Sequence, residues 1–450
     1  MKTDAFLFPL RGKLRKLAVY GALGLGLLYG LGVLAGFAWL HYVRKNDEIS
    51  LGDLALFRWQ SVRRDMAAQK FAKAKVEWEA QKYQAAYLSY SSAVRKDPDN
   101  IPGRLSAAAF LRAVGATNMG IAMLEEGLIR APDDRRLLEQ TFELLIASGR
   151  DRHALDLLHG RYASKLSDPD GLPLQTYEIQ ATLNAEGAAA AQRLLERHVE
   201  LQKYPPATPV VSRVLWESQQ RLKAIDLLGK FVQAQSGDFA SQAMLARWQE
   251  AGGTPADGVR TAERACARFP QEMAPRVLLI EMLAADSSGP SRWQSAIGSY
   301  LRDFSGRPES ITLLAELAGR KGWADLARTL YQVGACQQPD LSLLALYYGD
   351  ALARNSRLVE LRQLLEQLET QAPEGNAAFM VQLRQRQVMA AAALGDQGNV
   401  REFTRRLATT LRTDPDALEA CRRRFLQLGI TEAVAELSGR TGTTRVTARQ

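Results

Sequence analysis

Prolines recur through this chain of 450 residues at one fixed spacing. Pro98 and Pro132 are 34 residues apart, and so are Pro339 and Pro373. The first two stand in similar local sequences, Lys-Asp-Pro-Asp-Asn and Arg-Ala-Pro-Asp-Asp. From Pro98 to Pro270 the distance is 172 residues, which is five such periods plus two. A period of this length, closed by proline, predicts stacked helical hairpins in which each repeat packs only against its neighbours.

Each period also places small residues, a turn signal and a helix stop in the same order. In the first one, Ala86 and Ala93 alternate with Tyr83 and Tyr90 ahead of the proline. Small side chains let two helices cross closely, and a glycine or polar residue opens the turn between them. Proline then ends the second helix, because it cannot continue the hydrogen-bond ladder. The Asp or Asn that follows is expected to cap the next helix.

This pattern resembles the tetratricopeptide repeat (TPR) family over about residues 67–438. The resemblance implies an all-α fold, a right-handed superhelical solenoid of antiparallel helical hairpins, with about ten to eleven repeats. The signature Trp, Leu, Gly and Tyr of the family's first helix are mostly absent. The stretches 160–240 and 284–308 break the period, so a related helical-hairpin repeat stays open there. A bundle of unrelated helices is the alternative for the whole chain.

The stretch from Leu17 to Leu40 contains no charged residue. As a helix, its 24 residues would extend about 36 Å, which exceeds the hydrocarbon core of a bilayer at about 30 Å. Tyr20 lies near one end and Trp39 near the other, as interfacial anchors do. We therefore expect one uncleaved transmembrane helix over residues 17–43, with a cleaved signal peptide as the alternative.

The net charge of +9 is concentrated near the two ends of the chain. Residues 1–16 carry +4 and residues 440–450 carry +3. A protein that follows phosphates needs a basic stripe on its folded body, so this distribution argues against nucleic-acid binding. Residues 401–424 hold seven arginines and a local charge of +3. A solvated helix face explains that run, and a docking patch for an acidic partner or anionic lipid is the alternative.

The basic N-terminus predicts the orientation of the span. By the positive-inside rule, the N-terminus lies in the cytoplasm and the repeat domain lies across the inner (cytoplasmic) membrane, in the periplasm. The expected organisation has five segments: a basic cytoplasmic N-terminus (1–16), a transmembrane helix (17–43), a juxtamembrane linker and helix (44–66), the TPR-like solenoid (67–438) and a disordered tail (439–450). Within the span, Ala22, Gly26 and Gly30 form one smooth stripe. Such a stripe permits close helix approach, so a homo-oligomer formed through the span stays open.

The sequence contains no constellation that points to catalysis. His153 and His159 are six residues apart, on different faces of a helix, whereas metal pairs on one helix need three or four. The three cysteines, Cys266, Cys336 and Cys421, are scattered and form no Cys-x-x-Cys pair. No phosphate-binding loop, nucleophile elbow or His-Glu-x-x-His occurs. We expect no enzyme, and no catalytic, cofactor-binding or metal-binding residue.

Partner binding in the resembled family uses the concave face lined by the first helix of each repeat. Side chains that the resemblance assigns to this groove carry both signs of charge, so it predicts no single ligand charge. They are Trp78, Arg112, Glu143, Glu316, Asp350 and Arg354.

The function implied is a membrane-tethered scaffold for protein–protein interaction. Cell-envelope assembly, secretion or polysaccharide export are the settings that analogy with the family suggests. One alternative is a cytoplasm-facing, membrane-bound regulator or co-chaperone with the same scaffold. A lower-ranked alternative is an enzyme with an unrecognised site, which predicts a deep pocket with convergent polar groups.

Overall fold

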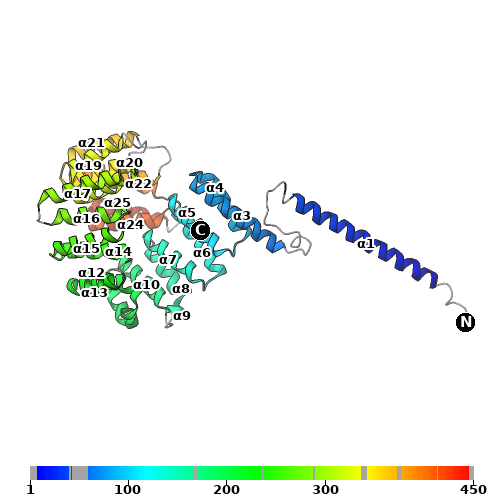
Figure 1. The fold of residues 1–450 in the computed structure, drawn as a ribbon. Coiled ribbons are helices and arrows are strands. Elements are labelled where there is room, and N and C mark those ends of the chain that lie inside the picture. Colours follow the sequence, from blue (N-terminus) through cyan, green and yellow to red (C-terminus); the bar gives the residue numbers. More distant parts are fainter. Residues whose placement is uncertain are drawn as a thin grey trace. The chain divides into compact units, whose positions relative to one another are not determined.

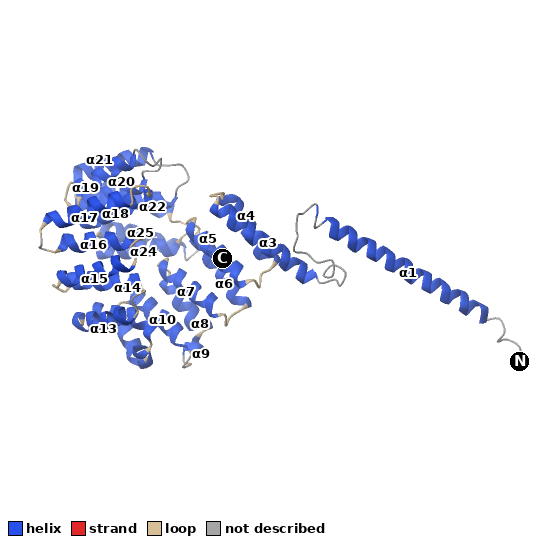
Figure 2. Cartoon of the chain, viewed as in Figure 1, coloured by secondary structure: helices blue, strands red, loops and turns tan. Residues whose placement is uncertain are grey.

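The computed structural model describes residues 8–39, 42, 59–166, 168, 171–235, 237–286, 289–335, 342–371, 377–412 and 414–444. All elements in these ranges are α-helices or short 3-10 helices, with no strand among them (Figure 2). This confirms the predicted all-α class for the described part of the chain. The chain divides into two compact units, Met1–Ser148 and Gly149–Gln450.

The first unit contains a long N-terminal helix and the first helices of the repeat array (Figure 1). Its elements are α1 (Phe8–Ala38), α3 (Trp59–Glu79), α4 (Tyr83–Lys96), α5 (Ile101–Ala113), α6 (Thr117–Arg130) and α7 (Arg135–Ala147). The aromatic rings of Tyr90 and Phe110 lie 5.3 Å apart between their centroids, and Trp78 meets Phe110 edge-on at 5.7 Å. Aromatic packing therefore joins the first two hairpins.

The N-terminal helix α1 requires a correction. Among the helices of the described residues, none is long and apolar enough to cross a membrane. The first turns of α1 carry four basic residues, and glycine recurs through the rest of the helix. The finding contradicts the predicted single-pass location in the inner membrane with a periplasmic repeat domain. Of the stripe expected to pair two spans, the surroundings of Ala22 and Gly26 lie outside what the structure describes, and Gly30 faces open space.

The second unit consists of further hairpins with two short interruptions. Its elements are α8 (Asp151–Arg161), α9 (Ala163–Leu166), α10 (Leu172–Glu186), α11 (Ala188–Arg197), η3 (Val199–Lys203), η4 (Pro205–Ala207), α12 (Thr208–Glu217), α13 (Arg221–Ala234), α14 (Phe239–Ala251), α15 (Pro255–Arg268), α16 (Met273–Ala285), α17 (Pro290–Asp303), α18 (Pro308–Lys321), α19 (Ala324–Ala335), α20 (Ser342–Arg354), α21 (Leu358–Gln371), α22 (Ala377–Ala393), α23 (Gln397–Thr410), α24 (Pro415–Gln427) and α25 (Thr431–Thr444). Pro339, Pro373 and Cys336 lie outside the described residues.

A residue in the left-handed backbone region marks each turn inside a hairpin. These positive-φ positions are Gln81, Gly115, Gly149, Gly187, Gln219, Gly253, Gly289, Gly322, Ser356, Gly395 and Gly429. Successive positions are 32 to 39 residues apart, and 34 is the commonest step. The described residues therefore contain eleven helix–turn–helix steps. The stretch 160–240, where the period was expected to break, holds α9, η3, η4 and two shortened helices, α11 and α12.

Proline and side-chain caps separate one hairpin from the next, as the sequence predicts. Pro98 follows the last residues of α4, and the Asn100 side chain then accepts a hydrogen bond of 2.8 Å from the Gly103 amide. At the next boundary the Asp134 side chain accepts one of 3.0 Å from the Leu137 amide. These caps satisfy amides that have no partner inside the helix.

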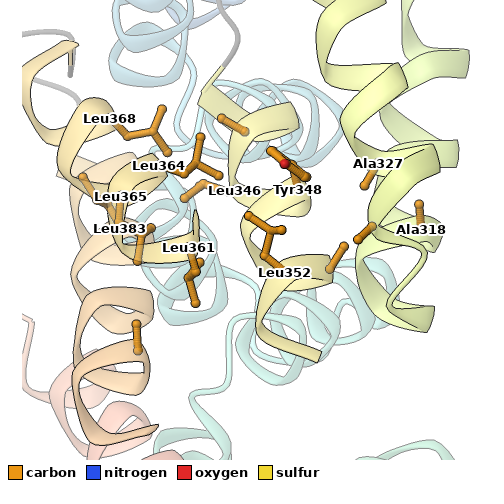
Figure 3. Close-up of a cluster of buried hydrophobic side chains, with 14 of the residues drawn as sticks. Ala318, Ala327, Leu346, Tyr348, Leu352, Leu361, Leu364, Leu365, Leu368 and Leu383 are labelled. Atoms are coloured by element: carbon orange, nitrogen blue, oxygen red, sulfur yellow. The ribbon is translucent and has the colours of Figure 1, made fainter. Parts of the chain in front are cut away.

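Neighbouring hairpins bury apolar side chains against each other in shared clusters. Figure 3 shows a buried cluster to which α18, α19, α20, α21 and α22 all contribute. Leu346 and Leu352 of α20 lie in its middle, between Ala318 of α18 and Leu364 of α21. Leu383 of α22 closes the other side. Since each helix buries side chains against two hairpins, the stack is stabilised by neighbour contacts rather than by one central core.

Candidate partner-binding face

From α14 to α22, the first helices of successive hairpins form one layer. Contacts join α14 to α16, α16 to α18, α18 to α20, and α20 to α22. Within the described residues, the second helices α15, α17, α19 and α21 do not contact one another to a comparable extent. The first helices therefore line the tighter, inner side of this stack. We call this surface the inner face.

Glu281 of α16 is the centre of a charge cluster on the inner face. Its side chain is 4% exposed and lies 3.1 Å from Arg247 of α14 and 2.8 Å from Arg320 of α18, between carboxylate oxygen and guanidinium nitrogen. The Lys321 ammonium lies 3.4 Å from Glu281 and 3.0 Å from Glu250. A buried carboxylate loses several kcal/mol of hydration, and cations from the neighbouring helices offset that loss. The cluster thus fixes cations of two flanking hairpins around one anion.

A second group of polar side chains follows on α18, α20 and α22. Asp350 of α20 accepts two hydrogen bonds, of 2.8 and 2.7 Å, from the Arg386 guanidinium of α22. Burial raises the pKa of the nearby Tyr347 hydroxyl, with a further increase from the negative charge of Glu316 on α18. Two of the predicted groove residues, Glu316 and Asp350, are therefore close enough to act on the same tyrosine.

The backbones of α18 and α20 approach closely beneath these side chains. A Cβ atom added at Gly319 would lie 2.7 Å from the carbonyl oxygen of Tyr347, which is backbone and cannot yield. Only glycine permits this approach. The charged side chains of the inner face are thus carried by rigid, tightly packed helices.

The other predicted groove residues have varied settings. In the first unit, Trp78 of α3 is half-buried against Phe110, and Arg112 of α5 is exposed. Glu143 of α7 is exposed and accepts a hydrogen bond of 2.9 Å from Gln140. Arg354, at the last position of α20 in the second unit, is exposed. A role of these side chains in partner binding stays a prediction.

Sequence reasoning missed the Glu281 cluster. A signal was present, because Glu281 interrupts the apolar run Val-Leu-Leu-Ile-Glu-Met-Leu in α16. A second signal is its spacing from Arg247, which is one full period of 34 residues. Equivalent positions of successive hairpins meet on the inner face, so a charge pair one period apart predicts a contact.

A His–Glu–His bridge was also missed. The buried carboxylate of Glu178 on α10 lies 2.8 Å from Nε2 of His159 on α8 and 3.2 Å from Nε2 of His198, which follows α11. Spacing along one helix could not reveal this contact, because the three residues lie on different elements. Within the described ranges, no group of three or more His, Cys, Asp or Glu side chains is arranged to hold a metal ion. The bridge instead connects two neighbouring hairpins.

The start of α8 and the start of α24 meet in the second unit. Nη2 of Arg150, which precedes α8, lies 3.8 Å from Oδ1 of Asp414, which caps α24. The neighbouring Asp151 is buried and accepts a hydrogen bond of 2.8 Å from Asn184. Burial raises the pKa of the Asp151 carboxyl, and the Asn184 bond and the Arg423 charge oppose the increase.

Three of the seven arginines in the stretch 401–424 form ion pairs with acidic side chains of the described residues, namely Arg405, Arg406 and Arg422. Arg405 lies 2.9 Å from Glu436, and Arg422 lies 2.7 Å from Glu419. Bonding to Arg422 lowers the pKa of the Glu419 carboxyl. These pairs favour a solvated helix face over an open basic patch.

Comparison with known proteins shows no family. No family model and no curated protein matches the sequence. Among solved structures, yeast Tom70 is 14% identical, with 83% of this chain and 96% of that chain covered and a TM-score of 0.32. A tetratricopeptide repeat protein from Parabacteroides merdae is 11% identical, covers 71% and 98%, and has a TM-score of 0.33. MamA protein is 14% identical, covers 47% and 93%, and has a TM-score of 0.24. Scores this low carry no argument, so the hairpin-repeat fold rests on the helices and turns described above.

Proposed function

We propose that this protein is a scaffold that binds a protein partner on the inner face of its second unit. The observation that carries the proposal is the Glu281 cluster. The side chains of Arg247 and Arg320 are 45% and 39% exposed, and each is fixed at one end by the same buried carboxylate. Charged side chains that are held in place before binding lose little conformational entropy when a partner binds. Such charges give an interface its specificity and a faster association rate.

The partner segment that fits this face carries acidic and basic side chains in turn. Arg247 and Arg320 offer guanidinium groups to carboxylates, whereas Glu316 offers an exposed carboxylate to a cation. The mixed signs agree with the groove inferred from the sequence, which predicts no single ligand charge. Binding to such a surface should weaken as salt is added.

We also propose that the role is not catalytic. This is supported by the way ionisable groups of the inner face pair with one another instead of converging on a deep pocket. The settings in envelope assembly, secretion or polysaccharide export depended on a membrane tether, as did the membrane-bound regulator or co-chaperone. Because no helix of the described residues can span a membrane, we propose a class of partner for this protein and no pathway.

Charge reversal on the inner face tests the scaffold proposal. The double variant Arg247→Glu, Arg320→Glu should lose the partners that the full chain captures from a lysate, as identified by mass spectrometry. The matched control is Arg328→Glu, an exposed arginine on the second helix α19, which should retain them. If the double variant folds, as judged by circular dichroism, and captures the same partners, binding on the inner face is refuted.

A further inference from the structure

Two segments of the second unit that are far apart in the sequence meet at the start of α8 and the start of α24. Arg150 and Asp414 form the contact, and their side chains are 17% and 29% exposed. From α8 onward, each hairpin contacts the next one along the chain, as far as the hairpin of α24 and α25. A series of contacts that returns to its starting point forms a ring. The hairpins of this unit are therefore closed into a ring, whereas the modules of an open array contact only their neighbours.

The charges at this junction are complementary. Three successive residues at the start of α8 are positive, negative and positive, and each is attracted by an opposite charge at the start of α24 or on it. The pairs are Arg150 with Asp414, Asp151 with Arg423, and Arg152 with Glu419. Alternating charges of this kind fix the register of a contact, because a shift by one residue brings like charges together.

The junction is polar, whereas the joints between successive hairpins are apolar. The buried apolar cluster that includes residues of α24 also draws on α22, α23 and α25, and it contains no residue of α8. An ion pair between partly exposed side chains contributes less to stability than the burial of one large apolar side chain. The junction is therefore the weakest link of the ring, and it should open before any joint between hairpins does.

A ring of repeats can open with little change inside each hairpin. The curvature of a repeat stack is the sum of small rotations between neighbouring repeats. The hairpins from α10–α11 to α22–α23 lie between the two sides of the junction and can share such a movement. Opening thus requires the polar contacts at the junction to separate, while the apolar clusters stay intact.

The inner face lies on the enclosed side of this ring. The first helices from α14 to α22 contact one another, and the second helices of these hairpins do not do so to a comparable extent, so the stack curves toward the first helices. With the junction closed, a large molecule can reach the inner face only through the open ends of the ring. With the junction open, it can also enter from the side.

We propose that the junction between α8 and α24 is a latch, which opens to admit a partner to the inner face and closes again around it. That the partner is a protein rests on the proposed scaffold function, whereas the opening of the latch does not. Because the attraction across the junction is between charges that are partly exposed to water, added salt should favour the open form.

Thiol labelling of the inner face tests the latch without any partner. Glu316→Cys introduces an exposed thiol on α18 of the purified full chain. Cys336→Ser removes one native thiol, and the remaining Cys266 and Cys421 are buried. The probes are N-ethylmaleimide and a maleimide attached to polyethylene glycol of the size of a small protein. In the parent chain, the large probe should react with the introduced thiol more slowly than the small one, and added salt should reduce the difference.

Charge reversal at the start of α8 should open the latch. In the double variant Arg150→Glu, Arg152→Glu, both new carboxylates repel the acidic side chains of α24. The ratio of the large-probe rate to the small-probe rate should therefore rise at least about tenfold. The matched control reverses two exposed arginines away from the junction, Arg268→Glu on α15 and Arg328→Glu on α19, and should leave the ratio unchanged.

A second variant keeps the test decisive if the double variant does not fold. Asp414→Asn removes the charge but keeps an oxygen that can accept the hydrogen bond from the Ala417 amide at the start of α24. It should raise the ratio in the same direction by a smaller factor. Equal ratios in the parent chain and in every folded junction variant overturn the latch. A raised ratio in a chain that captures no partner from a lysate supports the latch and refutes the scaffold function alone.

Discussion

Arg104 in the first unit and Glu281 in the second unit are both almost completely buried, and different kinds of group satisfy their charges. In the first unit, the Arg104 side chain is 1% exposed and donates hydrogen bonds of 2.7 Å and 3.0 Å to the carbonyl oxygens of Met123 and Pro98. In the second unit, Glu281 is satisfied by side chains of neighbouring hairpins that remain partly in water. The first charge is bonded to backbone carbonyl groups, and the second is paired with side chains that are partly exposed to water.

This difference indicates that Arg104 stabilises the fold, whereas Glu281 positions charged side chains on the surface. Arg104 fixes the loop at Pro98, so its loss removes a hydrogen-bond donor from two half-buried backbone carbonyl groups. The partners of Glu281 can return to water if the carboxylate is removed.

The largest effect is expected for Arg104→Met. Two charge-assisted hydrogen bonds of a buried side chain are lost, so the first unit should be destabilised by about 3 kcal/mol. Denaturant unfolding, with hydrogen exchange read over residues 59–148, measures the change. The control is Arg112→Met, at an exposed position eight residues further along α5. It should change the free energy of unfolding by less than about 0.5 kcal/mol. If Arg104→Met and Arg112→Met destabilised the first unit equally, the hydrogen bonds of Arg104 would have no special role in its stability.

The next effect is expected at the close approach beneath the inner face. Gly319→Ala places a methyl group 2.7 Å from the Tyr347 carbonyl oxygen and should destabilise the second unit by about 1–3 kcal/mol. The same change at Gly229 on α13, where no atom lies within 4 Å, should instead stabilise by about 0.5–1 kcal/mol. Thermal unfolding distinguishes the two signs. A stabilised Gly319→Ala would mean that α18 and α20 are not held this closely.

A smaller change in stability is expected for Glu281→Met. An apolar side chain of similar volume avoids the desolvation of the carboxylate, and the released cations are hydrated, so unfolding free energy should change by no more than about 1 kcal/mol. Binding to the captured partner should nevertheless weaken, because Arg247 and Arg320 lose their common anchor. Isothermal titration calorimetry with that purified partner measures the loss of affinity. A loss of stability as large as that of Arg104→Met would contradict the distinction.

A pH titration extends the comparison to a paired carboxyl of the second unit. Hydrogen bonding to Arg384 lowers the pKa of the Glu369 carboxyl, assisted by Gln387 and by Arg406. A carboxyl with a lowered pKa stabilises the fold above its unfolded pKa of about 4.3, and that contribution is lost as the pH falls through the folded value. Glu369→Gln should therefore be less stable than the parent at pH 7, with the difference shrinking below about pH 4. Denaturant midpoints across this range would show a constant difference if the pairing were unimportant.

The smallest effect concerns a hairpin turn. Gln219 has a φ of 64°, where side chains other than glycine are strained. Gln219→Gly should raise stability by about 0.5–1 kcal/mol, seen as a higher melting temperature. Gln220→Gly, at a φ of −87°, is the neighbouring control and should bring no gain. An unchanged melting temperature in both variants would show that the turn is not strained.

The sequence predicted those parts of the fold that depend on local chemistry. Proline and the cap at Asn100 act within a few residues, so the hairpin boundaries could be read from residue types. The left-handed turns at Gln219 and Ser356 could not, because neither side chain signals that backbone region. The expectation for α1 was wrong because it relied on the absence of charge in one stretch.

The inner face shows the limit of reading each repeat by itself. Glu316 and Asp350 were named from their place on a first helix, and the structure puts both near Tyr347. Arg247 and Glu281 were not named, because their pairing appears only when successive periods are superimposed. His159 and His198 meet at Glu178 through three separate elements, and no spacing rule covers that case.

The contact between Arg150 and Asp414 limits how the second unit can evolve. Open arrays of repeats gain and lose modules freely, because only the adjacent modules are affected. Here an added or deleted module would displace the far terminus by the height of one hairpin and break the junction. A change in the number of modules would therefore cost this unit a contact that an open array does not have, whereas a surface substitution away from the junction would leave the contact intact.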